Sequence, residues 1–169
     1  IEPLMPMQAT QKDIDFYNEY GYVAFKGVID DAFCDELTRD CDRLGGEKFV
    51  PIQSIHRKAD SFMRLCRNKN VLSLLDSLRG KRIIPINTTF IFAVPNNPYE
   101  NGSIPHQDWP GPKTHPVDSH NVVGIAIDGA DPDNGSLIVY PGSHRAGVLP
   151  FAVNPTFTDY REKRDIMVK

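Results

Sequence analysis

The sequence lacks several features that define large classes of protein. No apolar run approaches the ~18 residues that a membrane-spanning helix requires, and residues 1–7 do not form a basic segment leading into an apolar stretch. The 19 Lys and Arg residues against 22 Asp and Glu residues leave a formal net charge of -3. This balance lacks the cationic excess that binding to nucleic acid or anionic lipid normally needs. We therefore expect a soluble protein whose partners include neither nucleic acid nor a membrane.

Cysteine is also scarce. Cys34, Cys41 and Cys66 form no C-x-x-C pair, and three cysteines cannot all be bridged. A disulfide framework is not expected, which favours a reducing, cytoplasmic compartment. The sequence has no G-x-S-x-G motif, so it gives no sign of a hydrolase with a nucleophile elbow. With 169 residues, 40% of them apolar, we expect one domain spanning residues 1–169.

The first half of this domain, residues 1–80, carries the signals of helices. Thr10 with Asp13 resembles a capping box, and Gly21 is placed to end the helix that follows. Asp30 can cap a second helix, whose apolar residues recur at the helical period. The elements expected in this half are a helix over residues 10–20, a strand over residues 22–26, a helix from Asp30 to Gly45 and a helix over residues 70–80.

The second half, residues 81–169, favours strands. Residues 83–94, 122–127 and 137–140 are β-branched and aromatic runs, each followed by Pro, Gly, Asn or Asp. The segments between them are too short and too polar for crossover helices, which favours an antiparallel barrel or sandwich over a parallel sheet. We expect a mainly β fold whose flanking α-helices cover the outside.

The most informative short motif is H-Q-D at residues 106–108. Side chains alternate along a strand, so His106 and Asp108 would point the same way while Gln107 points away. An imidazole and a carboxylate that converge on one point are two members of the 2-His-1-carboxylate triad that holds non-haem Fe(II). The motif alone is a weak signal, because a surface histidine near an aspartate is the commoner explanation of H-x-D.

A second motif follows at Asn134–Arg145, which reads N-G-S-L-I-V-Y-P-G-S-H-R. H-Q-D followed by this pattern resembles the phytanoyl-CoA dioxygenase family of Fe(II)- and 2-oxoglutarate-dependent oxygenases. The stretches Asp15–Asp31 and Leu74–Gly80 are similar to the opening elements of that family and to its helix before the barrel. The resemblance covers nearly the whole chain.

The resemblance implies a double-stranded β-helix, a cupin-like jelly roll, with residues 81–169 forming the first part of its core. It implies His106 and Asp108 as ligands of Fe(II), 2-oxoglutarate as cosubstrate, and hydroxylation of a small-molecule or carrier-bound substrate by dioxygen. The family's third ligand, a distal histidine, and its 2-oxoglutarate arginine are expected beyond Lys169, so the jelly roll should be incomplete at the C-terminal end of this chain.

The resemblance also suggests where 2-oxoglutarate would bind. Thr89 lies close to the position of a family contact to the cosubstrate, with Asn87 as its neighbour. A hydroxyl bonded to the sheet backbone explains Thr89 equally well. Gln107 is a further cosubstrate contact suggested by the family, although strand alternation points it away from the metal.

Other residues near these motifs are weaker candidates. Trp109 and Tyr140 can line the mouth of a substrate site or pack the core. His115 and His120 lie in the loop after H-Q-D, where substrate contacts are common, but each is also typical of a solvated loop histidine. His144 is expected to be a structural turn residue and not the third ligand. The alternative to an oxygenase is a non-catalytic jelly-roll binding module that has lost the complete metal triad. The sequence does not indicate the oligomeric state.

Overall fold

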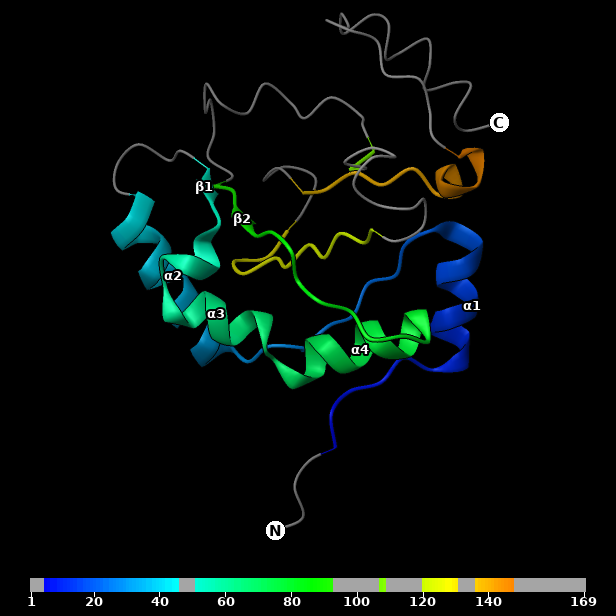
Figure 1. Ribbon diagram of the computed structural model, residues 1–169, viewed down its shortest axis with the longest axis horizontal. Coiled ribbons are helices and arrows are strands. Elements are labelled where there is room, and N and C mark those ends of the chain that lie inside the picture. The colour runs from blue at the N-terminus through cyan, green and yellow to red at the C-terminus, as the bar shows by residue number, and fades with distance from the viewer. Residues whose placement is uncertain (1–4, 46–50, 93–106, 109–119, 131–135, 148–169) are drawn as a thin grey trace, which may run out of the picture.

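The computed structural model describes residues 5–45, 51–92, 107–108, 120–130 and 136–147. In Figure 1, α1 lies at one side of the molecule, α2 and α3 lie at the other, and α4 runs between them along one edge. The elements in chain order are α1 (Gln11–Tyr20), α2 (Asp31–Gly45), β1 (Ile52–Gln53), the 3₁₀ helix η2 (Ile55–Arg57), α3 (Asp60–Cys66), α4 (Lys69–Arg79), β2 (Thr89–Phe90) and the 3₁₀ helix η3 (Ser143–Ala146).

Helix α1 begins and ends where the sequence predicts. The Thr10 hydroxyl accepts a hydrogen bond from the backbone N–H of Asp13, and the Asp13 carboxylate accepts one from the backbone N–H of Thr10. The Thr10 hydroxyl also donates a 2.7 Å hydrogen bond to the Asp13 carboxylate, and this bond, followed by that from the Thr10 backbone N–H, holds the pKa of Asp13 below its ordinary value. Gly21 ends the helix in the left-handed conformation, with φ of +80°.

The other two predicted helices are also confirmed. The Asp30 carboxylate accepts a hydrogen bond of 2.8 Å from the N–H of Phe33 at the start of α2. Asn68 caps α4 in the same way, because its side-chain oxygen accepts hydrogen bonds from the N–H groups of Asn70 and Val71. Gly80 follows α4 with φ of +61°.

The core lies between α2, α3 and the two short strands. Leu37 and Cys41, one helical turn apart on α2, are both buried and face Phe62 of α3 in the same apolar cluster. The rings of Phe62 and Phe90 meet edge to face at 6.0 Å between centroids, and Phe90 meets Phe92 at 4.8 Å. The buried members of the cluster are Leu37, Cys41, Ile52, Ile55, Ala59, Phe62, Leu65 and Phe92.

Polar contacts join α2 to α3 beside this core. The buried Ser61 hydroxyl donates a 2.5 Å hydrogen bond to the carboxylate of Asp40, which also pairs with Arg43 at 2.7 Å. The bond from Ser61, followed by that from Arg43, lowers the pKa of Asp40. Arg64 of α3 forms an ion pair with Glu36 of α2.

The strand predictions need correction. Within the described part of the run 83–94, residues 83–92, the structure forms a strand only at Thr89–Phe90. This strand pairs antiparallel with Ile52–Gln53, a segment that the sequence did not predict as a strand. Residues 22–26, 122–127 and 137–140 contain no strand. Apolar runs of this kind become strands only where a partner supplies backbone hydrogen bonds. The described part of the chain is therefore mostly helical, and the expected mainly β jelly roll is not visible in it.

Helix α3 was missed because its local signals are weak. It has seven residues, and the preceding residue, Ala59, provides no side-chain cap. Helix α3 is held instead by tertiary burial of Phe62 and Leu65. None of the helices in the described ranges combines the length and apolar character needed to cross a bilayer.

Candidate functional site

Two residues of the H-Q-D motif, Gln107 and Asp108, are described, and both are exposed. The amide Nε2 of Gln107 donates a 2.8 Å hydrogen bond to the backbone carbonyl of Gly147. This bond joins the motif to Gly147, two residues after the P-G-S-H-R segment, a contact that neither motif indicates by itself. His106, the other predicted ligand, lies outside the described residues.

The P-G-S-H-R segment forms a tight turn. Gly142 has φ of +79°, and its carbonyl accepts a hydrogen bond of 3.1 Å from the N–H of Arg145. The N–H of Ser143 donates to the carbonyl of Tyr140 at 3.2 Å. These bonds make residues 140–147 a compact unit, which we call the P-G-S-H turn.

The P-G-S-H turn packs on the C-terminal end of α1, beside which it lies in Figure 1. The N–H of Gly142 donates a 2.8 Å hydrogen bond to the carbonyl of Tyr20. The ring Nε2 of His144 lies 3.1 Å from the carbonyl oxygen of Asn18, which can only accept, so the ring nitrogen donates. The last carbonyls of a helix have no partners within the helix. His144 therefore serves the end of α1, as expected of a structural turn residue.

The C-terminal end of α1 also contacts segment 120–130. The side-chain amide of Asn121 donates a 2.7 Å hydrogen bond to the phenol oxygen of Tyr17. Charged residues of α1 and of the P-G-S-H turn both affect the Tyr20 phenol. A hydrogen bond to Glu19 of α1 raises the pKa of Tyr20, and the positive charge of Arg145 in the turn lowers it. The last turn of α1 is thus one place where segments 120–130 and 136–147 meet the helical half.

Thr89 and Asn87, the residues predicted to contact the cosubstrate, lie in and beside β2. Both are exposed. The Thr89 hydroxyl donates a 2.8 Å hydrogen bond to the side-chain oxygen of Gln53 on β1, and the side-chain oxygen of Asn87 accepts from the N–H of Thr88 at 2.9 Å. A side-chain partner on the neighbouring strand was not foreseen, since pairing of β1 with β2 has no local signal.

Thr88, between these two residues, makes a close polar contact with His56. Its hydroxyl lies 2.6 Å from Nδ1 of His56 and accepts a hydrogen bond of 3.2 Å from the His56 backbone N–H. Its carbonyl accepts from the N–H of Ser54 at 2.7 Å. His56 thus has a structural partner, and it binds the segment that contains Asn87 and Thr89.

The remaining predicted residues divide into two groups. His120 and Tyr140 are half-buried. Trp109 and His115 lie outside the described residues, like His106. Among the residues that the structure describes, no group of three or more His, Cys, Asp and Glu side chains is arranged to hold a metal ion. His106 is not among these described residues.

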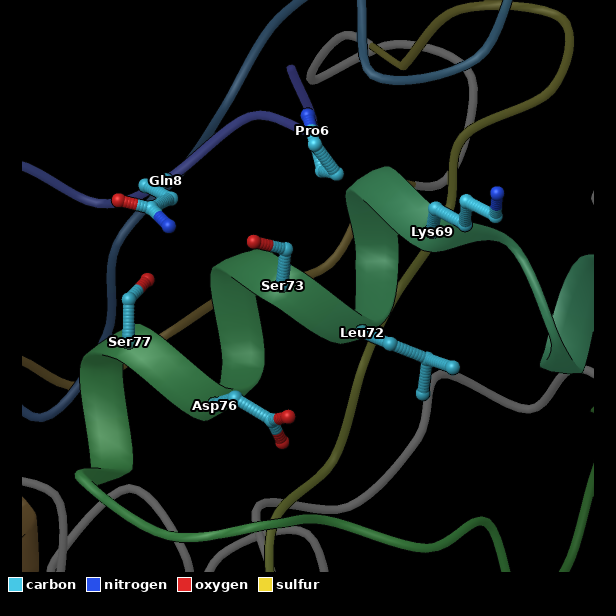
Figure 2. Close-up of a pocket in the computed structure, with 7 residues that line it drawn as sticks. All are labelled: Pro6, Gln8, Lys69, Leu72, Ser73, Asp76 and Ser77. Carbon is cyan, nitrogen blue, oxygen red and sulfur yellow. The ribbon is translucent and has the colours of Figure 1, made fainter.

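Two hollows flank α4, and none of the predicted site residues lines either of them. Figure 2 shows the first, of about 500 Å³, where Ser73 and Ser77 of α4 face the segment that carries Gln8. Ser77 accepts a hydrogen bond of 2.9 Å from the N–H of Ala9, so the N-terminal segment is pinned to the helix. The second hollow, of similar volume, lies between α3, α4 and residues 82–85. Neither Gln107 nor Asp108 of the H-Q-D motif is among the residues that line these two hollows.

Comparison with known proteins shows the family. The model of the family described as phytanoyl-CoA dioxygenase (PhyH) matches residues 17–166, most of the chain. The chain belongs to the phytanoyl-CoA dioxygenase family. This confirms the resemblance drawn from H-Q-D and P-G-S-H-R. No solved structure matches the chain significantly.

Named relatives agree with the phytanoyl-CoA dioxygenase family. The chain is 24% identical over 160 residues to peroxisomal phytanoyl-CoA dioxygenase of Bos taurus, covering 80% of this chain and 48% of that protein. It is 22% identical over 160 residues to the Homo sapiens protein of the same name, covering 80% and 47%. It is 35% identical over 95 residues to phytanoyl-CoA dioxygenase 1 of Oryza sativa subsp. japonica, covering 56% and 33%. The chain spans about half the length of the mammalian relatives it matches. All three of these relatives are named as dioxygenases.

Proposed function

We propose that the protein is an Fe(II)- and 2-oxoglutarate-dependent dioxygenase that hydroxylates a small-molecule or carrier-bound substrate. The observation that carries the proposal is the H-Q-D motif within the family match at residues 17–166. Family membership gives the class of reaction, and the motif supplies the side chains that such a reaction needs. The family match does not favour the alternative of a binding module without a metal.

The donor set fits Fe(II). His106 would supply an imidazole nitrogen and Asp108 a carboxylate oxygen, two of the three ligands in the facial arrangement that non-haem Fe(II) adopts. Asp108 is an exposed residue. With only two such ligands in the motif, a third from elsewhere in the full-length protein is part of the proposal.

Three further side chains are proposed to bind the cosubstrate. When bound, Fe(II) with 2-oxoglutarate and dioxygen supplies the oxidising power for hydroxylation, and 2-oxoglutarate leaves as succinate and carbon dioxide. Thr89, Asn87 and Gln107 are proposed to contact 2-oxoglutarate. The Thr89 hydroxyl would then exchange its bond to Gln53 for one to the cosubstrate.

The substrate side of the site is proposed to include four side chains near the two motifs. Of these, Tyr140 belongs to the P-G-S-H turn and His120 begins the described segment 120–130. Half-burial of both leaves part of each side chain available for contact. The set consists of Trp109, His115, His120 and Tyr140.

The proposal is tested by adding Fe(II) and 2-oxoglutarate to the full-length protein without oxygen. A weak visible charge-transfer band of the metal chelate is expected, and His106→Ala and Asp108→Asn should each abolish it, because each removes a ligand. Asp42→Asn is the matched control, since Asp42 is an exposed carboxylate on α2, outside the motif. An unchanged band in the His106→Ala variant would remove His106 from the metal site.

A further inference from the structure

A line of hydrogen bonds leads from α1 to the residue beside Asp108. It begins at the C-terminal end of α1, where the carbonyls of Asn18 and Tyr20 accept hydrogen bonds from His144 and Gly142. It continues through the P-G-S-H turn to the carbonyl of Gly147, which accepts from the side chain of Gln107. Residues far apart in the sequence are thus connected to the motif that carries the candidate carboxylate.

The contact between the turn and α1 is close. A Cβ atom built on Gly21 would lie 2.3 Å from Nδ1 and 2.8 Å from Cγ of the His144 ring. Only a residue without a side chain allows the imidazole to approach the helix end this closely. The ring therefore packs directly against Gly21, and its Nε2 is directed at the Asn18 carbonyl.

At the other end of the line, Gln107 and Asp108 are exposed and form no part of a strand. An exposed segment outside regular structure takes its position from side-chain contacts more than from a backbone ladder. The bond from Gln107 to Gly147 is such a contact, and the turn that provides Gly147 is itself tied to α1 at two points.

We propose that His144 is a positioning residue for the metal carboxylate: by holding the P-G-S-H turn on α1, it lets Gln107 fix the backbone that bears Asp108. The inference rests on the proposed function, since it assigns the purpose of the restraint to metal binding. It gives His144 a role that involves no contact with the metal, and it gives Gln107 a role as an anchor of the segment. Partners that orient metal ligands typically change metal affinity by about 10- to 100-fold when removed.

The test measures Fe(II) affinity of the full-length protein by anaerobic titration calorimetry. His144→Ala is expected to weaken Fe(II) binding about 10-fold, and Gln107→Ala should weaken it by a similar factor. Because both changes cut the same line, the double variant should lose little more than either single variant. Losses that multiply in the double variant would overturn the proposal.

A matched control separates positioning from general destabilisation. Thr10→Ala removes the capping box at the opposite end of α1 and so weakens the same helix without touching the turn. It should lower the melting temperature while leaving Fe(II) affinity unchanged. His144→Gln, which retains a side-chain N–H donor, should recover most of the lost affinity. Equal loss of affinity in Thr10→Ala and His144→Ala would overturn the proposal.

Hydrogen exchange distinguishes failure of this inference from failure of the proposed function. If the wild-type protein bound no Fe(II), or if His106→Ala bound it normally, the proposed function would fail. Faster amide exchange at residues 107–108 in His144→Ala, but not in Thr10→Ala, would still support the restraint. Unchanged exchange there would overturn it. Normal Fe(II) affinity in His144→Ala, together with lost affinity in His106→Ala, would overturn the positioning role alone.

Discussion

The contact between α1 and the P-G-S-H turn depends on one glycine. Gly21 has φ of +80°, and an added Cβ would lie 2.3 Å from the His144 ring. Gly21→Ala therefore combines a left-handed backbone, which costs an L-residue about 1–2 kcal/mol, with a collision that must displace His144. We expect the free energy of unfolding to fall by about 2–3 kcal/mol, measured by urea denaturation.

The control is the same substitution at Gly80. Its φ of +61° is also left-handed, but an added Cβ there meets nothing within 4 Å. Gly80→Ala therefore reports backbone strain without collision, and about 1 kcal/mol is expected. Equal losses at the two glycines would show that the imidazole does not sit against Gly21.

Cys41 gives a second prediction at this scale. Burial raises the pKa of its thiol to about 12, and the nearby carboxylates of Asp42 and Asp40 act in the same direction. At pH 8 roughly one Cys41 thiol in ten thousand would be ionised. Because the thiolate is the nucleophile, native protein should resist alkylation at Cys41 by iodoacetamide, read by mass spectrometry after digestion.

The urea-unfolded protein is the control for Cys41. Cys34, Cys41 and Cys66 should all be alkylated there, since unfolding removes the burial that raises the pKa of each thiol. Half-buried Cys34 and Cys66 should also react before Cys41 in the native protein. Rapid native labelling of Cys41 would contradict its place in the core.

The chemistry of the candidate site can be predicted from its residue types, whereas the contacts of those residues cannot. H-Q-D indicates metal ligands because imidazole and carboxylate are the donors that Fe(II) takes, which is a property of the residues themselves. The bond from Gln107 to Gly147 joins residues 40 positions apart, and that from Thr89 to Gln53 joins residues 36 apart. Such partners follow from the tertiary fold, and no local pattern records them.

At the scale of elements, the carboxylate of Asp40 on α2 joins that helix to Ser61 of α3, and its charge contributes to stability. The Ser61 hydroxyl, and then Arg43, lower the pKa of Asp40. A carboxyl whose pKa is lower in the folded state stabilises fully above its unfolded value of 3.8 and loses that contribution as pH falls through the folded value. Asp40→Asn should therefore cost about 1 kcal/mol at pH 7, with the difference from wild type shrinking below pH 3.8. Urea unfolding across pH 2 to 7 measures it.

Asp42→Asn is the matched control on the same helix. Asp42 is exposed on α2, so its replacement should change the free energy of unfolding little at any of these pH values. A loss in Asp40→Asn that stayed constant down to pH 2 would mean that the Ser61 bond does not depend on the charge of Asp40.

Helices α1, α2 and α4 were predictable from sequence, whereas helix α3 and the pairing of β1 with β2 were not, because their signals differ in range. Thr10 with Asp13, and Asn68 with Val71, satisfy helix ends within three residues, so the sequence contains both partners of each bond. The ladder of Ile52–Gln53 with Thr89–Phe90 needs a partner more than thirty residues away. The apolar runs at 122–127 and 137–140 read as strands on composition, but they have no strand partner among the described residues.

On the scale of the whole molecule, the buried apolar residues of the described chain lie between residues 37 and 92, whereas segments 120–130 and 136–147 carry several large apolar residues that are exposed. Leu37 is 0% exposed, whereas Leu137 and Ile138 are 78% and 77% exposed. Ile127 is the point where segment 120–130 packs against the core cluster. Apolar side chains as exposed as these are available to bind other apolar groups. The other large exposed apolar residues of these segments are Val122, Val123, Ile125 and Val139.

This distribution predicts how residues 1–169 behave when prepared as they stand. The chain should bind the dye ANS, and replacing Leu137 and Ile138 together by Ser should reduce the dye fluorescence with little change in melting temperature, since neither side chain supports the core. Leu37→Ala is the control, because removing a fully buried leucine typically costs about 2–5 kcal/mol. If the double variant lowered the melting temperature as much as Leu37→Ala, these two side chains would be packed in a core, as the jelly roll of the family requires. The comparison therefore decides whether residues 136–147 of this chain form part of such a core or present an open apolar surface.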